Sequence, residues 1–198
     1  METDHPLLSA ARKRNQDAWI KIFDLYSSSL YNYALRLCGD PVLADHIVGD
    51  VFAKLFDQLA AGKGPESNLR SYLYETAYHR IVDEARYAKR RAPLEAAIWL
   101  HQDRLFVSLR VEDEILFQEI QHAIRHKLTE DQRHVIILRF LEQFSLRETA
   151  TILGKRVDHV KVIQGRALVT LRKTLEYNGI RKTVLSSLVR QTPQAIGV

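Results

Sequence analysis

The 198-residue sequence contains a single cysteine, Cys38, so an internal disulfide cannot form. No apolar run approaches the ~20 residues that a membrane-spanning helix requires. The N-terminus also lacks the apolar segment of a secretory signal peptide. These absences predict a soluble protein of the reducing cytoplasm, in which Cys38 is a small buried apolar side chain.

Motifs that are typical of enzymes are missing as well. The sequence has no phosphate-binding glycine loop, no nucleophile elbow and no H-E-x-x-H motif. His122 and His126 are four residues apart, a spacing of metal ligands on a helix, but a third ligand is lacking. We therefore predict no catalytic residues, no metal and no cofactor, and we expect this histidine pair to be exposed.

Strand patterns, internal repeats and low-complexity segments are absent too, and nearly all apolar periodicity is helical. Hydrophobic residues make up 46% of the chain, which is enough for one or two small domains. The formal net charge of +5 favours a polyanionic partner without identifying one. The sequence therefore predicts an all-α protein with two small helical modules joined by a linker.

The most informative motif lies between Ser145 and Leu171 and is typical of a helix-turn-helix. Ser145 and Glu148 form a capping box for a first helix. Gly154 suits the left-handed residue that ends this helix, and Asp158 is expected to cap the second one. The second helix would enter the major groove of DNA. Its candidate contacts to base edges and phosphates are Arg156, His159, Lys161, Val162 and Arg166.

A first module is predicted over residues 15–91, as three helices with short connections. The run Gly39-Asp40-Pro41 separates the first two helices, since Asp40 is a good N-cap and Pro41 suits the first helical position. The second of these helices carries a wide apolar stripe, so it is expected to have neighbours on two sides.

A loop is predicted over residues 60–68, where small and polar residues gather. Ser67 or Asn68 is expected to cap the third helix, which contains Tyr72 as a predicted core residue. This helix would end in a basic run before Pro93.

The remaining chain divides into a linker, the helix-turn-helix module and a tail. Residues 92–127 are predicted to form an acidic linker that becomes helical towards its end. A second capping box, formed by Thr129 and Gln132, opens the module of residues 128–178. Apolar residues at helical spacing predict a short helix in the tail, residues 179–198.

Motifs in both modules resemble those of bacterial sigma factors. The run Ala44–Phe52 resembles A-E-D-L-V-Q-E-V-F, and Leu69–Arg86 resembles F-R-x-W-L-Y-x-I-A-x-N-x-x-x-D-x-x-R. Leu128–Arg139 resembles L-P-x-x-x-R-x-V-x-x-L-R, and Asp158–Ile163 stands where the family has G-T-V-K-S-R. In this order and spacing, the motifs resemble the extracytoplasmic-function group of the sigma-70 family over residues 15–176.

The resemblance implies a sigma factor that binds core RNA polymerase at its clamp helices and flap, recognises promoter DNA and helps to open it. It assigns the first module, sigma region 2, to core polymerase and the minus-ten element. The second module, region 4, is assigned to the minus-thirty-five element, and an anti-sigma factor is an implied partner. The alternative is a helix-turn-helix regulator that acts without core polymerase, which would not need the Ala44–Phe52 motif.

The same resemblance implies two sets of site residues in the first module. The core-binding set comprises Asp45, His46, Gly49, Asp50 and Phe52. The minus-ten set comprises Lys63, Asn68, His79, Arg80, Arg86, Lys89 and Arg90. His46, Gly49 and His79 depart from the acid, glutamine and asparagine of the family, and a glycine within a helix costs about 0.5–1 kcal/mol. These departures predict weaker docking on core polymerase and a divergent promoter preference.

Overall fold

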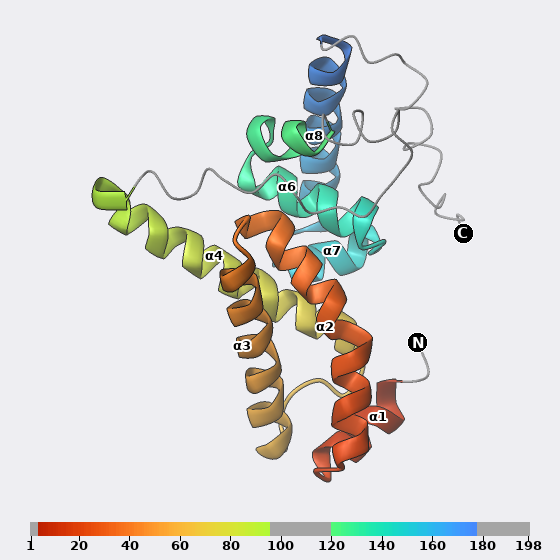
Figure 1. Ribbon diagram of the computed structural model, residues 1–198. Helices are drawn as coiled ribbons and strands as arrows, with labels where there is room; N and C mark the ends of the chain where they lie inside the picture. Colours follow the sequence, from red (N-terminus) through yellow and green to blue (C-terminus); the bar gives the residue numbers. More distant parts are fainter. Residues whose placement is uncertain (1–3, 96–119, 178–198) are drawn as a thin grey trace, which may run out of the picture. The chain divides into compact units, whose positions relative to one another are not determined.

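The computed structural model describes residues 4–95 and 120–177, and all regular structure in these two ranges is helical (Figure 1). The chain forms two compact units. The N-terminal unit contains α1 (Asp4–Arg12), α2 (Gln16–Cys38), α3 (Pro41–Ala60) and α4 (Leu69–Glu95). The C-terminal unit contains α6 (Glu130–Ile136), the π-helical turn η1 (Ile137–Leu141), α8 (Val157–Tyr177) and most of α7 (Leu146–Ile152). The predicted all-α class is confirmed.

The core of the N-terminal unit lies between α2, α3 and α4, which all pack against one another. The apolar stripe predicted for α3 is buried, and its residues Ile47, Val51 and Leu55 are at most 1% exposed. This helix begins as predicted, because an Asp40 carboxylate oxygen accepts the Val42 N–H at 2.8 Å.

The buried aromatic residue of α4 is Tyr74, and the prediction that Tyr72 belongs to the core is wrong. Tyr74 packs against Tyr33 of α2, with ring centroids 5.1 Å apart. Tyr72 is half-buried; burial raises the pKa of its phenol, and a hydrogen bond with Thr76 opposes the shift. Positions two residues apart lie roughly 200° apart around a helix, so only one of the two tyrosines faces the core. Cys38 is likewise only half-buried.

Helix α1 is an element that the sequence pattern did not predict. Leu8 and Ala11 are buried, at 1% and 2% exposure, and α1 packs on both α2 and α3. The chain then turns through Arg14, whose φ is 61°, and Asn15 caps α2 through the N–H of Ala18. A helix of nine residues has little stability alone, so this packing is what maintains it.

The start of α4 at Leu69 is as predicted, whereas its end differs from the prediction. Asn68 precedes the helix and its carbonyl accepts the Tyr72 N–H at 3.1 Å, but its φ of 53° is left-handed rather than extended. At the other end, the helix continues to Glu95, so the prediction that it ends before Pro93 is wrong. A proline loses one helical hydrogen bond and crowds the carbonyl four residues earlier, and α4 nevertheless continues two residues past Pro93.

Both capping boxes predicted for the second module are present. The pair Thr129 and Gln132 begins α6, with each side chain accepting the backbone N–H of the other residue. Ser145 and Glu148 do the same at the start of α7. One apolar cluster of this unit joins the helical residues 120–127, α6 and α8, and its buried members are Ala123, Leu128, Ile136, Ala167 and Leu171.

The turn of the helix-turn-helix is partly as predicted. Gly154 has a φ of 59°, the left-handed conformation expected after α7. The prediction that Asp158 caps α8 is wrong, because the first backbone bond of the helix joins the Val160 N–H to the Arg156 carbonyl. Asp158 instead lies in the first turn, where the helix dipole favours a negative charge.

Residues 96–119 of the predicted linker and the predicted tail helix lie outside the described residues. Within the described ranges, no helix is long and apolar enough to cross a membrane. The same ranges contain no cluster of three or more His, Cys, Asp or Glu residues that could hold a metal ion. His122 and His126 are both exposed, as expected.

Candidate nucleic-acid and protein interfaces

The outer face of α3 carries the predicted core-binding residues in one exposed patch. Asp45, His46, Gly49 and Asp50 are exposed, and Phe52 is half-buried beside them. Residues at these spacings share one side of a helix. A Cβ atom built on Gly49 would meet nothing within 4 Å, so packing does not require a glycine there. Asp45, His46 and Gly49 therefore form an exposed surface on this helix, with Asp50 and Phe52 at its edges.

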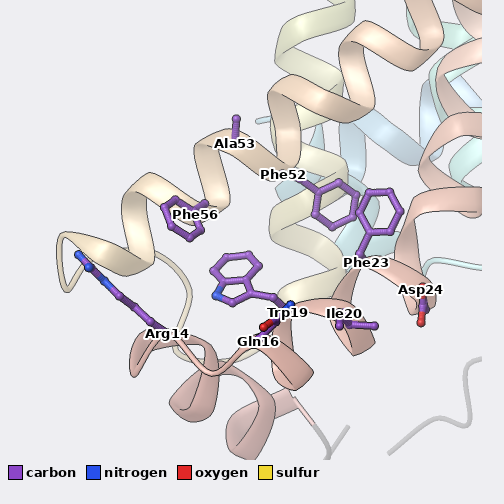
Figure 2. Close-up of a pocket in the computed structure, with 9 residues that line it drawn as sticks. All are labelled: Arg14, Gln16, Trp19, Ile20, Phe23, Asp24, Phe52, Ala53 and Phe56. Carbon is purple, nitrogen blue, oxygen red and sulfur yellow. The ribbon is translucent and has the colours of Figure 1, made fainter.

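Beside this patch, α2 and α3 line an open apolar groove of about 840 Å³, which sequence reasoning missed (Figure 2). Trp19 of α2 packs on Phe56 of α3, with ring centroids 5.2 Å apart. Phe23 and Phe52 pack in the same way at 4.9 Å. Phe23 is 50% exposed and Phe56 46% exposed. An exposed aromatic surface of this kind is typical of a protein-binding site.

The sequence signal for the groove was a second apolar row on α2. Trp19 and Phe23 each follow a buried residue, Ala18 and Ile22 respectively, by one position. The two rows are about 100° apart around the helix. The second row packs on aromatic residues of α3, which cover it only in part, so Phe23 remains 50% exposed.

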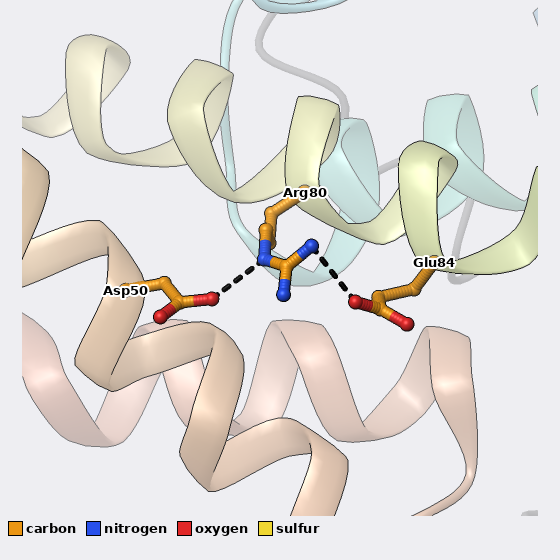
Figure 3. Close-up of polar contacts among 3 residues, drawn as sticks. All are labelled: Asp50, Arg80 and Glu84. Atoms are coloured by element: carbon orange, nitrogen blue, oxygen red, sulfur yellow. Dashed lines mark hydrogen bonds and ion pairs between the residues drawn. The ribbon is translucent and has the colours of Figure 1, made fainter. Parts of the chain in front are cut away.

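Asp50 also faces α4, where it holds Arg80 in an ion pair (Figure 3). An Asp50 carboxylate oxygen lies 2.6 Å from Nε of Arg80, and a Glu84 oxygen lies 2.8 Å from its Nη1. The hydrogen bond that Arg80 donates to Asp50 raises the pKa of Arg80 above its already high value. The Arg80 and Asp50 side chains are 40% and 52% exposed, which limits the pair to about 1 kcal/mol. The ion pair therefore connects a residue of the predicted core-binding set, Asp50, to a residue of the predicted minus-ten set, Arg80.

Most of the other minus-ten candidates are exposed, on α4 and on the loop before it. They are Lys63, Asn68, His79, Arg86 and Arg90. Arg86 and Asp83 form an exposed ion pair at 3.5 Å on the same helix. The side chain of Lys89 lies outside the described residues. The exposed cations of α4 can follow a phosphate backbone.

The loop of residues 61–68 has a well-defined backbone. Gly62 and Gly64 have φ angles of 70° and 86°, and the Lys63 N–H donates to the Gln58 carbonyl at 2.8 Å. At Gly64, an added Cβ would lie 3.3 Å from the Cβ of Gln58, so both space and φ favour glycine. This backbone presents Lys63 and Asn68 to solvent.

Helix α8 and Arg156, the residue before it, expose all five recognition-helix candidates, and α8 buries its other side. Val160, Ile163 and Ala167 are at most 7% exposed. The exposed residues are Arg156, His159, Lys161, Val162 and Arg166. Cationic groups bind phosphates and guanine edges, and an apolar side chain contacts the thymine methyl group. The surface therefore has the chemistry of a major-groove reader.

Arg139 of η1 connects α8 to the segment that follows η1. From η1, its Nε donates to the side-chain oxygen of Gln164 on α8 at 3.1 Å, and its Nη1 donates to the Phe144 carbonyl. Burial lowers the pKa of Arg139, and the charge of Glu148 opposes the shift. A guanidinium with several donors in one plane fixes both partners at once. Arg139 thus adds a polar contact to the apolar packing that holds α8.

Comparison with known proteins accounts for both units. Residues 22–91 match the family described as Sigma-70 region 2, and residues 126–173 match Sigma-70, region 4. The chain belongs to the sigma-70 family. The resemblance of its motifs is therefore confirmed, and as a sigma factor it is a transcription initiation factor rather than an enzyme.

The relatives of this sigma factor include members of the extracytoplasmic-function group, as the motifs predicted. It is 29% identical over 175 residues to the ECF RNA polymerase sigma factor SigX of Bacillus subtilis, covering 85% of this chain and 88% of SigX. It is 25% identical over 173 residues to the ECF RNA polymerase sigma factor BldN of Streptomyces coelicolor. That match covers 85% of this chain but only 64% of BldN.

Solved sigma-factor structures share its fold. The sigma factor RpoE from Bartonella quintana, solved with the anti-sigma factor NepR, aligns with a TM-score of 0.64 and 22% identity, covering 79% of this chain and 95% of that one. CnrH, solved with the cytosolic domain of CnrY, aligns with a TM-score of 0.66 and 21% identity, covering 88% and 97%.

Proposed function

We propose that this sigma factor contacts its partners through three surfaces. The outer face of α3 binds core RNA polymerase, α8 reads the minus-thirty-five element, and the loop of residues 61–68 captures an unpaired base of the minus-ten element. The observation that carries this proposal is that each surface is exposed and lies within a segment that matches sigma region 2 or region 4.

The core-binding surface is supported by the combination of a polar helix face and an adjoining aromatic groove. Asp45 and Asp50 offer carboxylates to basic side chains of a partner, and Phe52 leads into the groove. An apolar centre with a charged rim is the usual anatomy of a protein interface. His46 and Gly49 supply no carboxylate or amide at their positions, so the groove contributes the larger share of the contact.

The DNA-binding surfaces are supported by charge and shape. On α8, His159 and Val162 lie near the helix N-terminus, the part of a recognition helix that reaches base edges. Lys161 and Arg166 add positive charge for phosphates or guanines. In the N-terminal unit, Asn68 offers an amide to an extruded base, and unstacking that base costs a few kcal/mol, which contacts in the loop must offset.

An anti-sigma factor completes the proposed set of partners. It would act by covering the aromatic groove between α2 and α3, where Phe23 and Phe56 are about half exposed. We place the protein in the cytoplasm, where RNA polymerase is found.

Transcription in vitro tests the proposal. Purified core polymerase and this chain would be combined with a genomic promoter library, and the transcripts sequenced. Transcripts that share two upstream elements are expected. Binding to duplex DNA without core association or transcripts would instead identify a helix-turn-helix regulator that acts without core polymerase.

Paired variants then separate the surfaces. On α3, Asp45→Lys is expected to weaken core binding, whereas Asp57→Lys reverses an exposed charge near the other end of the helix and serves as control. On α8, Lys161→Ala is expected to weaken binding of the minus-thirty-five duplex, with the exposed Lys173→Ala as control. Equal effects within either pair would contradict the assigned surface.

A further inference from the structure

The loop of residues 61–68 is held from outside by the unpredicted helix α1. Arg12, the last residue of α1, points its guanidinium at three consecutive carbonyls of the loop. Its Nη1 donates to Lys63 at 2.8 Å, and its Nη2 donates to Gly64 at 3.4 Å and to Pro65 at 3.1 Å. Hydrogen bonds from a charged donor are stronger than neutral ones, so this arrangement constrains the loop.

These hydrogen bonds from Arg12 determine which way the peptide groups of the loop face. In a trans peptide, the carbonyl of one residue and the N–H of the next point in opposite directions. Because the Lys63 and Pro65 carbonyls face Arg12, the N–H groups of Gly64 and Glu66 face away from it. The loop therefore turns these two backbone donors away from Arg12.

Packing of α1 holds Arg12 in place beside the loop. The helix that carries it is anchored by Leu8 and Ala11, both buried against α2 and α3. The left-handed φ angles of Gly62 and Gly64 bring the loop carbonyls to the guanidinium. A lysine cannot replace this residue fully, because an ammonium lacks the planar fork that serves several acceptors.

We propose that Arg12 is a positioning residue for base capture: it holds the loop in the one orientation that discriminates the captured base, without touching DNA itself. This inference rests on the proposed role of the loop in the minus-ten element. Its specific content is that recognition of a base depends on an arginine of α1, outside the loop and outside α4.

The test uses holoenzyme, assembled from core polymerase and the full chain, and a fluorescent oligonucleotide of the non-template strand from a promoter found by transcription in vitro. Affinity is measured for the natural strand and for strands with one base substituted at each minus-ten position. The ratio of these affinities at the captured position is the readout, and core-binding affinity is measured in parallel. Arg12→Lys and Arg12→Gln are compared with Lys13→Gln, which removes a charge from the exposed neighbour.

Both Arg12 variants are expected to lower the discrimination ratio by about tenfold. This change corresponds to ~1.4 kcal/mol, which lies within the usual cost of one mismatched base. Core binding and the Lys13→Gln variant should remain unchanged. Direct loop variants, Lys63→Ala and Asn68→Gly, are expected to lower the ratio at the same base, and glycine at position 68 tolerates the left-handed φ.

The outcomes separate this inference from the proposed function. If the loop variants lower the ratio and the Arg12 variants do not, the positioning role is wrong while base capture by the loop stands. If no loop variant changes the ratio at any position, base capture itself is wrong. If the Arg12 variants weaken core binding as much as strand binding, Arg12 only maintains the fold, and the inference is also overturned.

Discussion

Mild acid is predicted to destabilise the C-terminal unit through one buried histidine. His134 lies in α6 with 1% of its surface exposed. Burial lowers the pKa of His134 from 6.5 to about 3, the positive charges of Arg133 and Lys155 act in the same direction, and Asp131 opposes them. The folded chain therefore keeps this imidazole neutral at any pH near neutrality.

The direction of the pH dependence follows from proton linkage. Because the pKa is lower in the folded chain, the unfolded chain binds the proton more readily. Stability is unaffected by His134 above pH 6.5, and it falls as the pH drops from 6.5 towards about 3. At pH 5.5 the folded histidine is still neutral, and protonation of the unfolded chain lowers the free energy of unfolding by about 1.4 kcal/mol.

Amide hydrogen exchange of α6 and α8, followed by mass spectrometry on the full chain, measures this effect within the unit. His134→Gln removes the titrating group, so its stability relative to the natural chain should rise by about 1.4 kcal/mol between pH 7.5 and 5.5, roughly a tenfold change in relative exchange rate. Comparing both chains at each pH cancels the intrinsic pH dependence of exchange. His122→Gln, which replaces an exposed histidine of the same unit, is the control. A constant difference between the natural chain and His134→Gln would refute the reasoning.

Three further substitutions test the local geometry. Gly49→Ala should raise the free energy of unfolding by about 0.5–1 kcal/mol in a denaturant titration, because alanine favours a helix over glycine and the added Cβ would meet nothing within 4 Å. A lower free energy of unfolding would reveal an unrecognised contact. Gly154→Ala should lower it by about 1 kcal/mol or more, since φ is 59° there, and an unchanged denaturation midpoint would contradict the left-handed turn. Asp50→Asn should cost less than about 1 kcal/mol at low salt and less still at high salt, because its pair with Arg80 is exposed; a salt-independent loss would argue against this.

Helix starts that carry a capping box could be predicted from the sequence. The capping boxes at Ser145 and Thr129 are confirmed because a cap depends only on side chains and N–H groups three residues apart. At Asp158, by contrast, the residue type led to a wrong prediction of the N-cap. An acidic residue is favoured both at the N-cap and in the first turn, so the residue type alone does not fix which of the two positions it occupies.

Side-chain burial across helices was harder to predict. Tyr72 and Tyr74 have similar apolar surfaces, and only the rotation of α4 against α2 determines which of them meets Tyr33. The groove was equally hard to predict. Trp19 and Phe23 have the apolar character of core residues, and only the position of α3 shows that they line an open groove. Periodicity defines a helix face, but the position of the neighbouring helix determines whether that face is covered.

The candidate site also contains a contact between distant segments that sequence motifs do not predict. Motif matching assigned Asp50 to core polymerase and Arg80 to DNA as independent residues, yet their side chains lie 2.6 Å apart. A basic partner that binds Asp50 weakens its hold on Arg80, and a phosphate that binds Arg80 releases Asp50. Linkage requires these two effects to be equal in free energy. Since the pair is exposed, the coupling is at most about 1 kcal/mol, enough to favour simultaneous engagement of the two proposed surfaces without making either depend on the other.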